Sequence, residues 1–285
     1  MKIAIIGLGL IGGSLAKAIK KNTNHICYGI DKNEKTVLSA LAQEAIDEEI
    51  DETRLNECDV SIVCLYPQGI IDYILENKKN FKKGSIVIDS CGIKSAVVNA
   101  VEQQLADEGV SFLGCHPMAG REFSGFEYSV DNLFDKASFI MTPTENTDSK
   151  TVETISELAK SIGFAKCVVS DPGEHDRIIA FTSQLAHIVS NAYVKSPSLL
   201  KQAGFSAGSF KDLTRVAKLN SDMWTSLFML NRDALLFEVD CIIDRLIEYR
   251  DALRDKDSKT LHDLLQAGND LKEKSLSESL ANEQK

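Results

Sequence analysis

Short apolar runs alternate with amphipathic helical segments from the start of the chain to about residue 170. In the segment 94–107, for example, Val97, Val101 and Leu105 recur every four residues and form one apolar face of a helix. This alternation is typical of a parallel β-sheet whose strands are joined by crossover helices. The predicted strands cover residues 2–7, 26–31, 59–65, 85–90, 110–115, 137–142 and 165–170.

The pattern changes after residue 173, where helical periodicity continues but strand-like runs stop. The apolar run from Met223 to Leu253 is longer than a typical globular helix. It therefore forms either two helices or one long helix with an exposed apolar face, and such a face often packs against a second subunit. We expect a homodimer. The predicted helices cover residues 174–195, 210–218, 222–254 and 257–274, and the polar end, 275–285, is expected to be frayed.

Length and charge narrow the class of protein. A chain of 285 residues is long enough for two domains, an α/β domain over residues 1–170 and an all-α dimerisation domain over 171–285. The formal net charge of −10 argues against a nucleic-acid or anionic-membrane partner, because phosphate binding needs clustered Lys and Arg. The expected partner is a small molecule. No apolar run reaches membrane-spanning length and no signal peptide precedes the first strand, so we expect a cytoplasmic enzyme.

The seven cysteines are odd in number, scattered, and without a C-x-x-C pair. They are expected to be buried, reduced thiols. Cys115 and His116 are adjacent, but no further ligand-type residues surround them, and no metal site is predicted.

A glycine-rich turn follows the first predicted strand and opens a helix: Gly7-Leu8-Gly9-Leu10-Ile11-Gly12. Gly7 permits a tight turn, Gly9 lets the backbone approach a pyrophosphate, and Gly12 lets the helix pack against the strand. The helix starting near Leu10 and Ile11 would direct its N-terminal dipole at the phosphates. This context predicts a Rossmann-type dinucleotide-binding domain.

Asp31 ends the second predicted strand, nineteen residues after Gly12. A carboxylate there can accept hydrogen bonds from both ribose hydroxyls and would repel a 2′-phosphate. The predicted cofactor is therefore NAD rather than NADP, although Lys32 is adjacent.

His116 directly follows a predicted strand, in the segment from Gly114 to Gly125. Ligands of such sheets bind beyond the carboxyl ends of the strands, so His116 is placed where substrate would meet cofactor. A histidine with a near-neutral pKa can accept the proton of a substrate hydroxyl. A loop histidine with a structural role fits the sequence equally well.

Two further clusters lie in the helical half. Ser183 and Gln184 precede His187 by four and three residues, which places all three on one helix face. By itself, His187 among apolar neighbours is more often a core residue than a ligand. Asp212 and Arg215 are three residues apart on a predicted helix, where a surface ion pair is the simpler explanation. The alternative is that Arg215 binds a substrate carboxylate and that Asp212 holds Arg215 in place.

These clusters, in this order, resemble the prephenate/arogenate (cyclohexadienyl) dehydrogenase family of tyrosine biosynthesis, and the resemblance extends from Lys2 to at least Asn231. The motifs that carry it are GLGLIGGS, HPMAGREFSG, EHDRIIAFTSQLAHIVSNA and FKDLTRVAKLNSDMW.

The resemblance implies an NAD-dependent oxidative decarboxylation of a dianionic cyclohexadienol. It makes His116 the acceptor of the hydroxyl proton, Arg215 the ligand of the ring carboxylate, and His187 a neighbour of the substrate side chain. It also implies a second set of substrate-binding residues: Arg121, Glu122, Gln184, Gly208, Asp212 and Trp224.

The chain departs from the family at some positions. Gly92 stands where many members have a serine thought to support the catalytic histidine, a role that Ser90 or a water is expected to take. Arg121 replaces a small polar residue, Gln184 a histidine and Ala186 a proline. The alternatives to prephenate or arogenate dehydrogenase are a different enzyme with a Rossmann domain and a helical domain, such as a hydroxyacid dehydrogenase, and a non-catalytic NAD-binding sensor.

Overall fold

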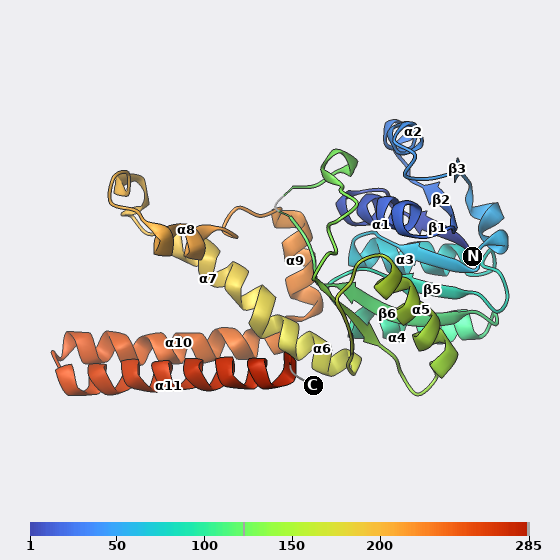
Figure 1. Cartoon of the computed structure of the whole chain (residues 1–285). Coiled ribbons are helices and arrows are strands. Elements are labelled where there is room, and N and C mark those ends of the chain that lie inside the picture. The colour runs from blue at the N-terminus through green and yellow to red at the C-terminus, as the bar shows by residue number, and fades with distance from the viewer. Residues whose placement is uncertain (122, 284–285) are drawn as a thin grey trace. The chain divides into compact units, whose positions relative to one another are not determined.

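The computed structural model describes residues 1–121 and 123–283, which form two compact units, 1–234 and 235–285. The first unit is built on an eight-stranded sheet with the strand order β3-β2-β1-β4-β5-β6-β7-β8 (Figure 1). The strands are β1 (Lys2–Ile6), β2 (Ile26–Ile30), β3 (Glu48–Glu49), β4 (Val60–Val63), β5 (Ile86–Asp89), β6 (Ser111–Pro117), β7 (Ser138–Thr142) and β8 (Lys166–Val169).

The seven predicted strands are all present, and β3 is a short addition at the edge. The expectation of a wholly parallel sheet was wrong at one place, because β7 pairs antiparallel with β6. A parallel pair needs a crossover connection, usually helical, whereas the described residues between these two strands form only the short 3₁₀ turn Phe126–Tyr128. The chain therefore turns back beside the strand that it has just left.

Helices cover both faces of the sheet, as the alternation of side chains along β1 requires. Ile3 and Ile5 pack with residues of α1 (Leu10–Asn22), α2 (Glu34–Ala42) and α5 (Ser149–Ser161) on one face. Ala4 and Ile6 pack with residues of α3 (Pro67–Asn77) and α4 (Ser95–Ala106) on the other. Because both sides of the sheet are buried, the polar ligand site is confined to its edge, at the ends of the strands.

The chain is helical after β8, as predicted. Asp171 caps α6 (Pro172–Ile179), which continues through a π-helical turn, η3 (Ala180–Leu185), into α7 (Ala186–Tyr193). A 3₁₀ turn (Leu199–Lys201), α8 (Gly208–Thr214) and α9 (Ser221–Leu230) follow. Asn231 separates α9 from α10 (Arg232–Arg254), so the long apolar run forms two helices rather than one.

The second unit contains the remainder of α10 and α11 (Ser258–Glu283). The Tyr249 hydroxyl donates to the Leu264 carbonyl oxygen at 3.3 Å and links the two helices. The expectation that residues 275–285 are frayed was wrong as far as Glu283, because the segment 275–283 contains the good helix formers Leu, Glu and Ala. The unit has several exposed apolar side chains: Leu236, Phe237, Leu246, Leu253, Leu265 and Leu271.

Among the helices formed by residues 1–121 and 123–283, none is both long enough and apolar enough to cross a membrane.

Candidate active site

The turn between β1 and α1 needs glycine at two positions. Gly7 has φ of +87°, and its N–H donates to the Ile30 carbonyl oxygen at 2.8 Å. A Cβ atom on Gly12 would lie 1.9 Å from the Gly7 carbonyl oxygen, so no larger residue fits there. By contrast, a Cβ on Gly9 would meet no atom within 4 Å. The backbone is thus open at Gly9, where a ligand can approach it.

The helix that follows this turn has features of an anion-binding end. Gly9 is the N-cap of α1 and offers no side-chain cap, and the first turn, which includes Leu10 and Ile11, has no acidic residue. Its backbone N–H groups can therefore bind phosphate oxygens. The Asp31 carboxylate is fixed beside the turn, where it accepts from the Leu8 N–H at 2.8 Å and from the Asn33 N–H at 2.9 Å. These residues fit a dinucleotide.

His116 lies near the carboxyl end of β6 and pairs in register with Ile140 of β7. Its Nδ1 atom is 3.0 Å from Nε2 of His175, which α6 contributes. On its other side the ring faces the loop after β5, since a Cβ on Gly92 would lie 3.6 Å from both Nε2 and Cε1 of His116. Burial, reinforced by the nearby positive charge of Lys94, holds the pKa of His116 well below its ordinary value. His116 is therefore a neutral imidazole at the sheet edge.

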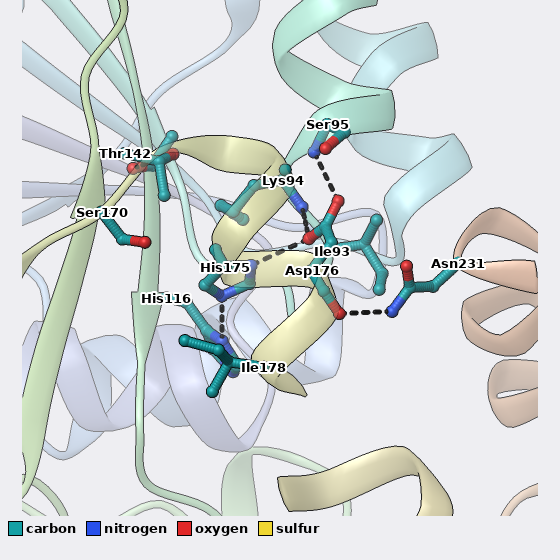
Figure 2. A network of polar contacts seen from close by, with 12 residues as sticks. Ile93, Lys94, Ser95, His116, Thr142, Ser170, His175, Asp176, Ile178 and Asn231 are labelled. Carbon is teal, nitrogen blue, oxygen red and sulfur yellow. Dashed lines mark hydrogen bonds and ion pairs between the residues drawn. The ribbon is translucent and has the colours of Figure 1, made fainter. Parts of the chain in front are cut away.

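Asp176, next to His175 on α6, joins three segments of the chain (Figure 2). Its Oδ1 atom is 2.8 Å from His175 Nδ1 and accepts from the Lys94 N–H, while its Oδ2 atom accepts from the Ser95 N–H at the start of α4. The Asn231 side chain donates to the Asp176 carbonyl oxygen at 2.8 Å. Burial favours the neutral acid, but the hydrogen bonds from His175, Lys94 and Ser95 outweigh it and lower the pKa of Asp176.

Beneath His116 lies a fully buried ion pair between Lys94 and Asp89. The ammonium group of Lys94 also donates to the Cys115 carbonyl oxygen. Asp89 accepts from the backbone N–H groups of Cys91 and Cys115 at 3.1 and 3.0 Å. The pair is thus fixed to the residue that precedes His116, and its ammonium group contributes a positive charge close to the imidazole.

A second cluster forms on α7 and α9. The His187 ring packs against Trp224 with centroids 3.8 Å apart and the ring planes tilted by 31°, and its Nδ1 atom donates to the Ser183 carbonyl oxygen at 2.9 Å. Burial lowers the pKa of His187, the bond to Ser183 opposes this, and the charge of Arg215 adds to the lowering. His187 therefore contacts Trp224, and Arg215 is close enough for its charge to act on the imidazole.

The remaining predicted substrate residues differ in their surroundings. Gln184 is buried in the π-helical turn, where its Oε1 atom accepts from Asn231 at 2.8 Å. Gly208 and Asp212 are exposed on α8. Arg121 is exposed, and its guanidinium lies 3.4 Å from the Tyr128 carbonyl oxygen. Glu122 lies outside the described residues. Their roles as ligands stay predictions.

Sequence reasoning missed His175, Asp176 and Lys94. Ser90, expected as one support for His116, hydrogen-bonds with the Cys64 thiol, and His175 contacts the His116 ring. The available signal was an adjacent His-Asp pair in a helix that begins directly after the last strand. Within residues 1–121 and 123–283, no group of three or more His, Cys, Asp or Glu residues is arranged to hold a metal ion.

Comparison with known proteins assigns the family. The model of the prephenate dehydrogenase nucleotide-binding domain matches residues 15–169, and the model of the prephenate dehydrogenase dimerization domain matches residues 171–267. The chain belongs to the prephenate dehydrogenase family. Prephenate dehydrogenase of Bacillus subtilis is 32% identical over 270 residues, which cover 91% of this chain and 72% of the relative. Cyclohexadienyl dehydrogenase of Zymomonas mobilis is 28% identical over 268 residues, which cover 91% of this chain and 90% of the relative.

Solved structures agree with this assignment. Prephenate dehydrogenase from Aquifex aeolicus in complex with hydroxyphenyl propionate and NAD+ is 26% identical, with a TM-score of 0.86 over 96% of this chain and 98% of that chain. Arogenate dehydrogenase from Synechocystis is 27% identical, with a TM-score of 0.82 over 96% of this chain and all of that chain. A 3-hydroxyisobutyrate dehydrogenase from Mycobacterium tuberculosis, at 17% identity and a TM-score of 0.51, shares only the fold. The chain is thus an oxidoreductase of this family rather than a hydroxyacid dehydrogenase.

Proposed function

We propose that the chain is an NAD-dependent prephenate dehydrogenase, which converts prephenate to 4-hydroxyphenylpyruvate and carbon dioxide in tyrosine biosynthesis. The observation that carries the proposal is His116, a part-buried imidazole with a lowered pKa at the edge of the sheet where the dinucleotide turn lies. Relatives named prephenate dehydrogenase, at 32% and 30% identity, support prephenate as the substrate.

NAD, when bound, supplies the hydride acceptor for the hydrogen on ring C4 of the substrate. In our proposal, His116 accepts a hydrogen bond from the 4-hydroxyl group and then takes its proton as the carbonyl of the dienone forms. The ring carboxylate leaves as carbon dioxide, and the electron pair of the broken C–C bond completes the aromatic ring. The phenolate oxygen formed in this way takes the proton back from His116, which restores the neutral imidazole. Lys94 and burial serve this step by keeping His116 unprotonated before the reaction.

The substrate is a dianion, whereas the chain carries a net charge of −10, so binding requires a local positive site. We assign the ring carboxylate to the guanidinium of Arg215, which suits forked hydrogen bonding to a carboxylate. His187 and Trp224 would contact the side-chain end of the substrate. Gln184, Gly208, Asp212, Arg121 and Glu122 would complete the pocket.

Asp31 supports the choice of NAD over NADP, because its carboxylate is held beside the glycine turn and would repel a 2′-phosphate. The Aquifex aeolicus relative was solved with NAD+. We also propose a cytoplasmic homodimer assembled through the helical half, which the match to the dimerization domain and the exposed apolar side chains of α10 and α11 support.

Arogenate dehydrogenase activity is the second candidate. The similarity to Synechocystis arogenate dehydrogenase favours it specifically. Arogenate differs from prephenate in carrying an amine instead of a keto group on the side chain, so the same His116 and Arg215 chemistry would apply to both.

The substitution His116→Asn tests the proposed base. Steady-state NADH formation from prephenate should fall by roughly 100-fold or more in kcat, the usual range for loss of a general base, with little change in KM. A matched control is His25→Asn, because His25 precedes β2 at the opposite ends of the parallel strands and should leave kcat unchanged. A His116→Asn enzyme with more than about a tenth of wild-type turnover would refute the assignment.

A further inference from the structure

We infer that His175 and Asp176 form a positioning pair that fixes the tautomer of His116, so that its Nε2 atom carries the lone pair that accepts the substrate proton. This inference rests on the proposed function, because it concerns the proton acceptor of that reaction. It extends the site by two residues on α6 that act through His116 rather than on the substrate.

The contacts form one continuous chain of polar atoms. Asp176 Oδ1 is 2.8 Å from His175 Nδ1, and His175 Nε2 is 3.0 Å from His116 Nδ1 (Figure 2). His175 is 2% exposed and Asp176 5% exposed, so water cannot readily replace these partners. Each donor in this series of contacts therefore has to face an acceptor, and each acceptor has to face a donor.

Asp176 determines which atom donates and which accepts in each of these hydrogen bonds. Its two oxygens accept from the backbone N–H groups of Lys94 and Ser95, which can only donate. These bonds favour the ionised carboxylate, which also has only acceptor sites. The Nδ1 atom of His175 must therefore donate to Asp176.

The position of the proton on each of the two histidine rings follows from this donor at His175 Nδ1. With both rings neutral, a proton on Nδ1 of His175 leaves a lone pair on its Nε2 atom. That lone pair requires His116 to donate from Nδ1, and His116 then has its own lone pair on Nε2. When His116 takes the substrate proton on Nε2, the bond to His175 and the charge of Asp176 stabilise the resulting imidazolium.

The Nε2 atom of His116 faces the loop that follows β5. A Cβ at Gly92 would lie 3.6 Å from His116 Nε2, and Gly92 belongs to the loop at the carboxyl end of β5. Ligands of parallel sheets bind at this edge. Because Gly92 has no side chain, it places no side-chain hydrogen-bonding group in front of Nε2.

Asp176 is itself held in place. Its carboxylate bonds two backbone N–H groups at the start of α4, and its carbonyl oxygen accepts from Asn231. The orientation of His116 on β6 is thereby tied to α4 and α6. A catalytic base needs such fixed geometry, because small misplacements reduce the rate of proton transfer.

The direct test is ¹⁵N NMR of the histidine side chains in the wild-type enzyme above about pH 7.5, where ¹⁵N shifts distinguish a protonated from an unprotonated ring nitrogen. We expect the His116 signals, assigned by their loss in His116→Asn, to show a proton on Nδ1 and none on Nε2. A proton on Nε2 in the neutral wild-type ring would overturn the inference. This measurement needs no turnover, so it remains decisive even if the enzyme proves inactive on prephenate, a result that would instead refute the proposed function.

Two variants of His175 add a kinetic test. His175→Phe keeps a planar aromatic ring but removes both nitrogens, and kcat should fall by roughly 100-fold or more while KM for NAD stays near wild type. His175→Gln can still accept from His116 Nδ1 through its side-chain oxygen and should recover most of this loss. A structural role alone predicts instead that Phe, the closer match in shape, preserves activity at least as well as Gln.

The matched control is Asp171→Asn, on the same helix. Asp171 is exposed and only caps α6, and asparagine is an equally good N-cap, so its kcat should equal that of wild type. Retention of wild-type kcat by His175→Phe, or a lower kcat in the Gln variant than in the Phe variant, would contradict the positioning role.

Discussion

Lowering the pH from about 7.5 to about 5.5 should destabilise the protein through one part-buried imidazole, His116. Burial and the nearby Lys94 and His175 hold its folded-state pKa well below the ordinary value of 6.5, against the opposing charge of Asp176. In this window the unfolded chain binds a proton at His116 and the folded chain does not, so the free energy of unfolding decreases as the pH falls. The stabilisation is fully present above pH 6.5 and is lost progressively below it.

The size of the effect follows from linkage. If the folded protein leaves His116 unprotonated at pH 5.5, its contribution is RT ln(1 + 10), or about 1.4 kcal/mol relative to neutral pH. Asp176 does not interfere, because its lowered pKa places its own titration at more acidic pH. His187 has a lowered pKa as well and acts in the same direction, so the contribution of His116 has to be isolated by substitution.

Urea unfolding of wild type and of His116→Gln at both pH values provides that comparison. Between pH 7.5 and pH 5.5, the free energy of unfolding of the wild type should fall by about 1.4 kcal/mol more than that of the variant, because glutamine does not titrate. The total protein concentration must stay fixed, since association of two chains would add to the apparent stability. Equal losses in the two proteins would refute the claim that His116 is buried in its neutral form.

Three further substitutions test other parts of the site. Lys94→Met leaves the buried Asp89 carboxylate without its counter-charge and should lower the free energy of unfolding by about 3–5 kcal/mol in urea titrations; a loss below about 1 kcal/mol would contradict the buried pair. Arg215→Gln should raise KM for prephenate far more than it changes kcat, and an unchanged KM would show that the carboxylate binds elsewhere. Asp31→Ser should raise KM for NAD and reduce the preference for NAD over NADP. Unaltered NAD kinetics would show that Asp31 does not bind the cofactor.

The parts of this site that follow from local sequence were predictable. The glycine turn depends on residues within six positions of one another, and the structure shows the open backbone at Gly9 and the close contact at Gly12 that this spacing implies. The position of His116 near the carboxyl end of β6 was predictable, because the apolar run before it predicts a strand, and strand ends define the ligand edge of a parallel sheet.

The support for His116 was not predictable in the same way. His175 and His116 are 59 positions apart, and nothing in their spacing shows that α6 places one ring against the other. Lys94 and Asp89 are charged residues, which sequence reasoning assigns to solvent, yet the fold encloses both completely. The reversal of β7 was likewise hidden, because an apolar strand has the same pattern in either direction.

The central claim is tested most directly by the initial rate of NADH or NADPH formation from prephenate and from arogenate, with each cofactor in turn. Our account predicts the highest kcat/KM for prephenate with NAD. Binding of NAD without turnover of either cyclohexadienol would contradict it and would indicate a non-catalytic NAD-binding sensor.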